Sequence, residues 1–198
     1  MMKYKMHKGY TILEAVIALT VLTIAVSVSL NIITSSVDSE NLNRDLVIAA
    51  QLAEEGVEEM INVYQSNIVK FGAANSVNCG LMMPSFNSSA DLCLASSNKF
   101  TAGNYFIGLK GTSWTYVKID KEFIVSNALN PKFKLYLFDS GGSKIYGANL
   151  SGATATDFYR VVSISDITEV SATITSKVGW VRQGGFITTR EVSHVINF

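Results

Sequence analysis

The chain has 198 residues, enough for one domain with a core of its own and too few for two large domains. It is 48% hydrophobic but only 16% charged, against roughly 25% charged in an ordinary soluble domain, which indicates a membrane segment or a buried assembly surface. The formal net charge is +0 and no basic stripe follows the N-terminus, so the composition argues against a nucleic-acid-binding protein.

The N-terminus combines a basic leader with a long apolar stretch. Residues 1–9 contain three lysines and no acid, and residues 15–37 contain no charged side chain. At about 1.5 Å per residue, such a stretch crosses a hydrocarbon core of about 30 Å as a helix. The lysines before it, and Asp38 and Glu40 after it, favour a cytoplasmic N-terminus. The sequence therefore predicts a single membrane-spanning helix over residues 10–37.

Three other interpretations of this stretch compete. It could be a plain signal anchor, a secretory signal peptide cut near Ala25-Val26-Ser27, or the core helix of a soluble protein. A core helix is the least consistent of these, because the run is long and lacks polar punctuation. The other two leave Glu14 unexplained. A carboxylate in an apolar helix costs roughly 2.5–3.5 kcal/mol at membrane depth, so we expect Glu14 to have a partner.

Residues 9–14, Gly-Tyr-Thr-Ile-Leu-Glu, resemble the prepilin processing motif of type IV pilin-like proteins, since a lysine-rich leader precedes them and an apolar helix follows. The resemblance implies that prepilin peptidase, a membrane-embedded aspartyl peptidase, cuts between Gly9 and Tyr10 and methylates the new amine of Tyr10. It also implies that Glu14 meets the terminal amine of a neighbouring subunit. Glycine suits the cleavage site because, without a Cβ, its carbonyl can be approached closely.

The same resemblance implies a location and a set of partners. The subunit is expected in the inner (cytoplasmic) membrane, with an extracytoplasmic C-terminal domain, and then in a type IV pilus or a type II secretion pseudopilus. The expected partners are prepilin peptidase, other pilin or pseudopilin subunits, the inner-membrane assembly platform and the lipid bilayer. Many major pilins carry a proline near the position of Asn31, and its absence here favours a minor pilin or a pseudopilin.

Residues 38–65 are predicted to continue the helix in amphipathic form. Their apolar residues recur at spacings of three and four and give one stripe: Leu46, Ala49, Ala50, Ala53, Val57, Met60, Ile61 and Tyr64. Glu54, Glu55, Glu58 and Glu59 fall on other faces, as a solvated surface or as a contact for a basic partner subunit. Gly56 costs about 1 kcal/mol against alanine within a helix, which indicates close packing there.

The remaining residues, 66–198, are predicted to form a globular head. Residues 66–99 are rich in Asn, Ser and Gly and are expected to be a loop. This loop holds both cysteines, Cys79 and Cys93, and an exported domain favours a disulfide between them over two buried thiols. Two cysteines and two distant histidines lack the spacing of a metal site.

After residue 100 the pattern is typical of strands. Residues 105–109, 114–119 and 133–138 are β-rich, and residues 139–143 are a turn signal with too few acids for a calcium loop. Three further strands are predicted at the C-terminal end: residues 158–164, 172–181 and 186–195. Gly184-Gly185 is the expected hairpin turn between the last two. On the middle strand, alternate residues from Val170 to Trp180 should share one face.

The final hairpin is similar to those of pilus-modification (V-type) minor pilins and of I-type minor pseudopilins of type II secretion. The expected fold is α+β, with a long N-terminal helix whose outer half packs on an antiparallel sheet. We found no catalytic constellation, because His194 and Ser193 are adjacent strand residues that face opposite sides. No enzyme activity and no cofactor are expected. The alternative function is that of a signal-anchored extracytoplasmic binding domain that does not assemble, and a membrane-anchored enzyme is a third.

Overall fold

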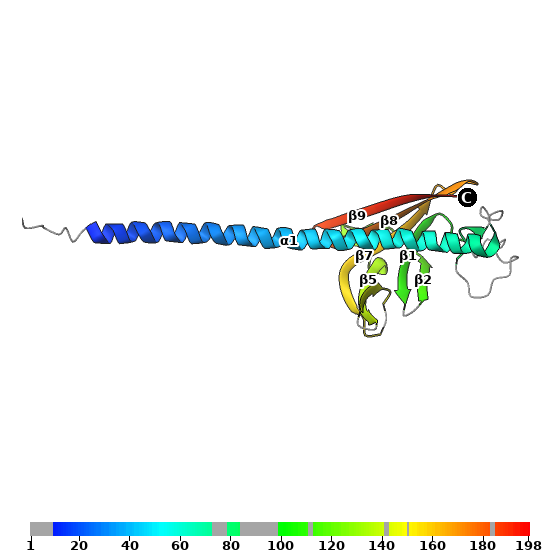
Figure 1. Ribbon diagram of the computed structural model, residues 1–198, viewed down its shortest axis with the longest axis horizontal. Coiled ribbons are helices and arrows are strands. Elements are labelled where there is room, and N and C mark those ends of the chain that lie inside the picture. Colours follow the sequence, from blue (N-terminus) through cyan, green and yellow to red (C-terminus); the bar gives the residue numbers. More distant parts are fainter. Residues whose placement is uncertain are drawn as a thin grey trace, which may run out of the picture. The chain divides into compact units, whose positions relative to one another are not determined.

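The computed structural model describes residues 10–72, 79–83, 99–110, 113–140, 143–149, 151–182 and 185–198. By its contacts the chain divides into two compact units, Met1–Asp45 and Leu46–Phe198. The first unit is helical in its described part, and the second contains the end of the same helix together with the strands (Figure 1). We call the second unit the head.

Helix α1 spans Tyr10–Phe71, past the end at residue 65 that the sequence pattern predicts. The extra turns are held by tertiary contacts. The side chain of Asn67 is buried, and its Nδ2 donates to the carbonyl oxygens of Gly80 at 2.9 Å and Met82 at 2.8 Å. Asparagine is typical of loops because its side chain competes with the hydrogen bonds of the helix backbone. In Asn67 the side-chain amide instead donates to the two carbonyl oxygens outside the helix.

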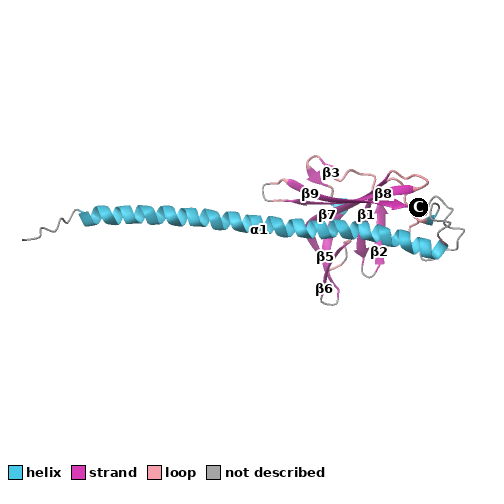
Figure 2. Cartoon of the chain, turned by 45° about the horizontal axis from the view of Figure 1, so that its top comes forward, coloured by secondary structure: helices cyan, strands magenta, loops and turns pink. Residues whose placement is uncertain are grey.

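Seven strands form one sheet in the order β2-β1-β6-β5-β7-β8-β9 (Figure 2). Their bounds are β1 (Gly103–Lys110), β2 (Ser113–Lys118), β5 (Lys134–Ser140), β6 (Ser143–Gly147), β7 (Thr154–Ser165), β8 (Ser171–Val181) and β9 (Ile187–Asn197). The predicted combination of one long apolar N-terminal helix and a largely antiparallel sheet is confirmed. All six predicted strands are present. Strands β5 and β6 pair antiparallel on either side of the predicted turn at residues 139–143, of which residues 141 and 142 lie outside the described residues.

The sheet is mixed, however, and not wholly antiparallel as predicted. Strand β6 pairs in parallel with β1 at Gly147 and Leu109, while β1 also pairs antiparallel with β7. The β5–β6 hairpin thus lies between the end of β1 and β7. A Cβ at Gly147 would lie 2.3 Å from the Leu109 carbonyl oxygen, so only glycine permits this approach. Strand β6 was not predicted from the sequence, because it is short and begins with two polar residues.

The final hairpin forms as predicted, with β8 and β9 antiparallel along their whole length. The connecting residue Gly185 has a φ of 81°, which favours glycine; Gly184 lies outside the described residues. The predicted alternating face of β8 is buried from residue 172 to residue 180, with Trp180 only 1% exposed. Val170 was wrongly placed on that face: it precedes the strand and is 68% exposed.

Within the head, α1 lies along β8 and runs in the opposite direction. Ala49 and Ala53 share a buried apolar cluster with Trp180. Further along the helix, Val57 and Met60 share a second cluster with Ile174. The predicted apolar stripe therefore packs on the sheet, one helical turn after another.

The opposite face of the sheet is covered by a small hairpin, β3 (Ile124–Val125) with β4 (Ala128–Leu129), and the short 3-10 helix η4 (Pro131–Phe133). On β8, Gly179 faces this side, because Ser176 faces α1 and successive residues alternate. A Cβ at Gly179 would lie 2.8 Å from the Leu129 side chain. The described part of the head thus has three layers.

Gly56 sets how closely α1 approaches the sheet. A Cβ there would lie 2.5 Å from the Ser176 hydroxyl oxygen and 3.2 Å from Arg160 Cδ. We therefore expect Gly56→Ala to lower Tm in thermal unfolding followed by circular dichroism, although alanine is favoured by about 1 kcal/mol in an isolated helix.

Adding Ser176→Ala to Gly56→Ala should restore most of the lost stability, because the Ser176 hydroxyl is the nearest obstacle and has no hydrogen-bond partner in the described part of the head. A Gly56→Ala variant as stable as the wild type would contradict the packing role.

Candidate functional site: an apolar helix segment with one carboxylate

The first half of α1 exposes an apolar surface. Its large apolar side chains from Ile12 to Val37 are 50–70% exposed. The most apolar stretch of 18 residues has a mean hydropathy of 2.4, and none of it is buried. By length and composition α1 is able to cross a membrane. This agrees with a transmembrane helix or a signal anchor.

Several hydroxyl side chains in this segment and just after it hydrogen-bond back to the helix. Thr20 donates to the carbonyl oxygen of Ile17 at 2.8 Å, and Ser27 donates to that of Thr23 at 2.8 Å. The same kind of bond is made by Thr23, Ser29, Thr34 and Ser39. These polar groups need no water, as an apolar surrounding requires.

Glu14 is the one charged residue between residues 10 and 37. Its side chain is exposed, and the described residues give it neither a hydrogen bond nor an ion pair. It lies near the start of α1, whose first residue is Tyr10. Gly9, the predicted cleavage position, lies outside the described residues, so cleavage there stays a prediction. The segment therefore presents one carboxylate in an otherwise uncharged surface.

The head contains a buried polar contact that the sequence analysis missed. Arg160 on β7 is fully buried, and its Nη1 and Nη2 donate to the carbonyl oxygens of Leu52 at 3.0 Å and Ile107 at 2.7 Å. Its Nη1 also lies 3.4 Å from Glu55 Oε1. Burial lowers the pKa of Arg160, while the charge of Glu55 acts in the opposite direction. One guanidinium thus joins α1 to two strands.

Glu59 extends this contact toward β2. It is buried, and the Tyr116 hydroxyl donates a hydrogen bond to its carboxylate. Burial raises the pKa of Glu59 above its ordinary value of 4.5, while the Tyr116 hydroxyl and Arg160 lower it. The expectation of a solvated face for all four glutamates is therefore wrong for Glu59 and for the partly buried Glu55. The spacing of these glutamates in the sequence is typical of a solvated helix face. It could not show that Arg160 and Tyr116, far away in sequence, would contact them.

Cys79 lies where α1 ends. It is 1% exposed and packs with Met82 and Phe71. Cys93 lies outside the described residues, so the predicted disulfide between Cys79 and Cys93 stays a prediction. In the described part of the chain, no group of three or more His, Cys, Asp or Glu side chains is placed to hold a metal.

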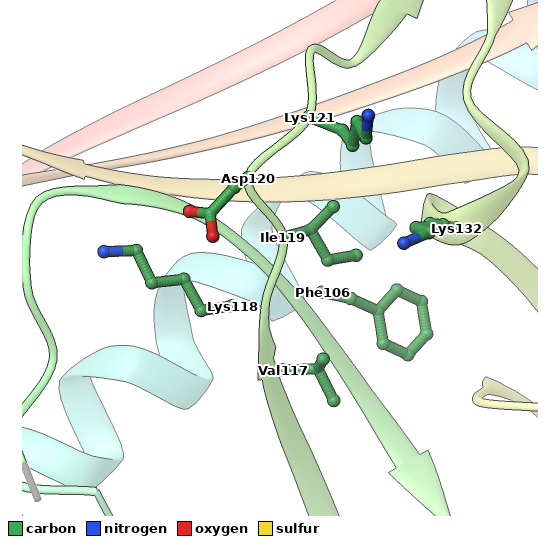
Figure 3. Close-up of a pocket in the computed structure, with 7 residues that line it drawn as sticks. All are labelled: Phe106, Val117, Lys118, Ile119, Asp120, Lys121 and Lys132. Atoms are coloured by element: carbon green, nitrogen blue, oxygen red, sulfur yellow. The ribbon is translucent and has the colours of Figure 1, made fainter. Parts of the chain in front are cut away.

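A shallow pocket of about 410 Å³ lies beside the end of β2, with Phe106, Val117 and Ile119 at its apolar floor (Figure 3). Three lysines and one carboxylate stand at its rim: Lys118, Lys121, Lys132 and Asp120. Figure 3 shows that Lys118 and Lys121 point in different directions, and Lys118 Nζ donates to the Thr101 hydroxyl at 2.7 Å. The lysines do not converge on one ligand atom.

Comparison of the chain with protein-family models, with curated proteins and with solved structures gave no match.

The raised pKa of Glu59 makes a prediction for stability. The folded head binds this proton more tightly than the unfolded chain, so protonation of Glu59 stabilises the fold. As pH rises from 4.5 through the raised pKa, the wild type should lose free energy of unfolding relative to Glu59→Gln, in which this titration is absent.

Urea unfolding of both proteins across this pH range measures the difference between their free energies of unfolding. The titration of the other carboxylates contributes equally to both proteins and drops out of this difference. Glu58→Gln is the matched control, since Glu58 is exposed and should leave the pH profile of the wild type unchanged. Parallel curves for wild type and Glu59→Gln would disprove the effect.

Proposed function

We propose that this chain is a structural subunit, a minor pilin or pseudopilin, which is cut after Gly9 and assembled through the apolar half of α1. The observation that carries the proposal is the exposed apolar segment with its single carboxylate, Glu14, close behind a lysine-rich leader and Gly9. A carboxylate within the membrane is energetically costly, and a segment that only anchors a domain would gain nothing to offset that cost.

In the proposed mechanism, cleavage creates a positive amine at Tyr10. In an assembled filament, the Glu14 carboxylate of one subunit pairs with the Tyr10 amine of its neighbour. Removing either charge would leave the other buried and unpaired, so the pair fixes the register between subunits.

The subunit would wait in the inner membrane, with its head on the extracytoplasmic side. Prepilin peptidase would process it there, and the assembly platform would move it into a pilus or a secretion pseudopilus beside other subunits. Its apolar segment would then exchange lipid for the apolar segments of those subunits. A signal-anchored binding domain shares the membrane helix with this proposal but not the cleavage and the pairing.

The mature N-terminus tests the processing step. We expect mass spectrometry of the membrane-extracted protein to show a chain that starts at N-methylated Tyr10. In Gly9→Val, the added side chain should keep the peptidase from the carbonyl and leave the leader attached. An intact Met1 in the wild type, or a start near Val28, would refute processing.

Glu14→Ala tests the pairing step. Cleavage should be retained, while the fraction of subunit recovered in sheared filaments should fall to a small part of the wild-type value, because the Tyr10 amine loses its partner. Glu14→Asp should recover part of that fraction, since it keeps the charge. Glu58→Ala, which removes an exposed carboxylate from the head, serves as the control. Normal incorporation of Glu14→Ala would rule out the pairing role.

A further inference from the structure

The seven-stranded sheet ends in two open edges, β9 on one side and β2 on the other. Strand β9 is 11 residues long and keeps an unbroken register with β8, without a bulge. It contains no proline and no lysine, although proline, lysine and bulges are features that protect an edge strand from pairing with another chain. No strand in the described part of the chain covers its outer side. Strand β9 is therefore open to a further strand.

The hydrogen bonds at the two ends of the β8–β9 hairpin show which backbone groups of β9 face outward. Arg182 N–H donates to the Phe186 carbonyl oxygen at 2.9 Å, and Phe198 N–H donates to that of Val170 at 2.8 Å. Both pairs continue the register of β8 and β9, and bonded pairs alternate with non-bonded pairs in an antiparallel ladder. The even-numbered residues of β9 thus bond to β8, and the odd-numbered residues direct their N–H and carbonyl groups to the open edge.

Strand β2 has an open edge of the same kind. Ile119 N–H donates to the Asn104 carbonyl oxygen at 2.8 Å and continues the β1–β2 register, so the even-numbered residues of β2 direct their backbone groups outward. Four successive antiparallel pairings, β9–β8, β8–β7, β7–β1 and β1–β2, separate the two edges, so β2 runs parallel to β9. Two copies of the head in the same orientation can therefore join β9 of one to β2 of the other as a parallel pair.

The side chains at each edge lie on the α1 side of the sheet or on the opposite side. Ser176 faces α1, so its partner Val192 on β9 does too, and Val195 faces the other side. The Tyr116 hydroxyl bonds to a glutamate of α1, so the even-numbered side chains of β2 face α1 and Val117 faces the other side. Val195 and Val117 are 53% and 46% exposed, so each edge presents an exposed valine on the side away from α1.

One parallel register brings the apolar side chains of the two edges together on both sides of the sheet. With Val195 beside Val117 on the side away from α1, Val192 lies beside Trp114 on the α1 side. Both of these are half-buried and pack against the same apolar cluster of the head. The one charged residue of β2, Lys118, then lies beside an isoleucine of β9, so the register places no like charges side by side.

We propose that neighbouring heads join edge to edge, with β9 of one copy of this chain pairing in parallel with β2 of a second copy. The contact is heterologous, so a joined pair keeps one free β9 and one free β2 and can continue along a filament. Pairing of β9 with β9 would instead close after two copies. The inference rests on the assembly step of the proposed function, and it adds a contact between heads to the one that Glu14 makes.

Disulfide trapping in sheared filaments tests this contact. Cells that produce the Val195→Cys and Val117→Cys chains together should give a disulfide-linked dimer that mass spectrometry shows to contain one chain of each. Aligned residues on paired strands lie within reach of a disulfide. Wild-type filaments, whose chains carry Cys79 and Cys93 alone, give the background.

The matched control pairs Thr189→Cys with Val117→Cys. Thr189 is exposed on the same side of β9 as Val195, but it lies six residues, or about 20 Å, along the strand and should give little dimer. Equal trapping of the two pairs, or dimers that form only between two Val195→Cys chains, would overturn the inference.

Val195→Pro tests the backbone pairing. Proline removes the N–H group of residue 195, which points to the open edge, and so leaves the β8–β9 ladder intact. Recovery of the full-length subunit in sheared filaments should fall well below that of Val195→Thr, which keeps this N–H group, while circular dichroism checks that both variants are folded. Equal recovery of the two folded variants would refute the pairing. If Val195→Pro does not fold, the disulfide trapping still decides.

The wild-type chain separates failure of the edge contact from failure of the proposed function. Its absence from sheared filaments would refute assembly itself, and the edge contact with it. Its presence there, together with no dimer between the Val195→Cys and Val117→Cys chains, would refute the edge contact alone.

Discussion

The burial of one guanidinium constrains the whole head. Arg160 is held by the Leu52 carbonyl on α1, the Ile107 carbonyl on β1 and the Glu55 carboxylate, so it ties the helix to the centre of the sheet. A buried charge that loses its partners is strongly destabilising, which penalises any other register of helix on sheet. The close approach at Gly56 serves the same contact, since a side chain there would meet Arg160 Cδ.

The sequence patterns predicted the parts of the head that depend on local periodicity. The stripe on α1 and the alternation along β8 each follow from burial of one face, and both are present. The contact of Arg160 on β7 with Glu55 on α1 was not predictable, because the two residues are far apart in sequence and no local pattern pairs them. For the same reason Glu59 was expected in solvent, although Tyr116 on a distant strand shields it.

The apolar segment of α1 could be predicted from the sequence more fully than the head. Its character depends on composition alone, so the apolar run and Glu14 could be recognised without any tertiary contact. The hollow between the β3–β4 hairpin and the β8–β9 connection is the opposite case. Phe186 and Ile124 are far apart in sequence, and each is unremarkable alone; the β3–β4 hairpin and the β8–β9 connection must fold before the two line one hollow.

The hydroxyl bonds within the first half of α1 have a consequence for its surface. Thr20, Thr23 and Ser27 donate their hydroxyl protons to carbonyl oxygens of their own helix, so they need no hydrogen-bond acceptor from their surroundings. Acyl chains and the side chains of another apolar helix are then nearly equivalent solvents for them. The segment can therefore move from acyl chains to the side chains of another apolar helix without breaking these hydrogen bonds. Glu14 differs, because the free energy of its charge depends on which of the two surrounds it.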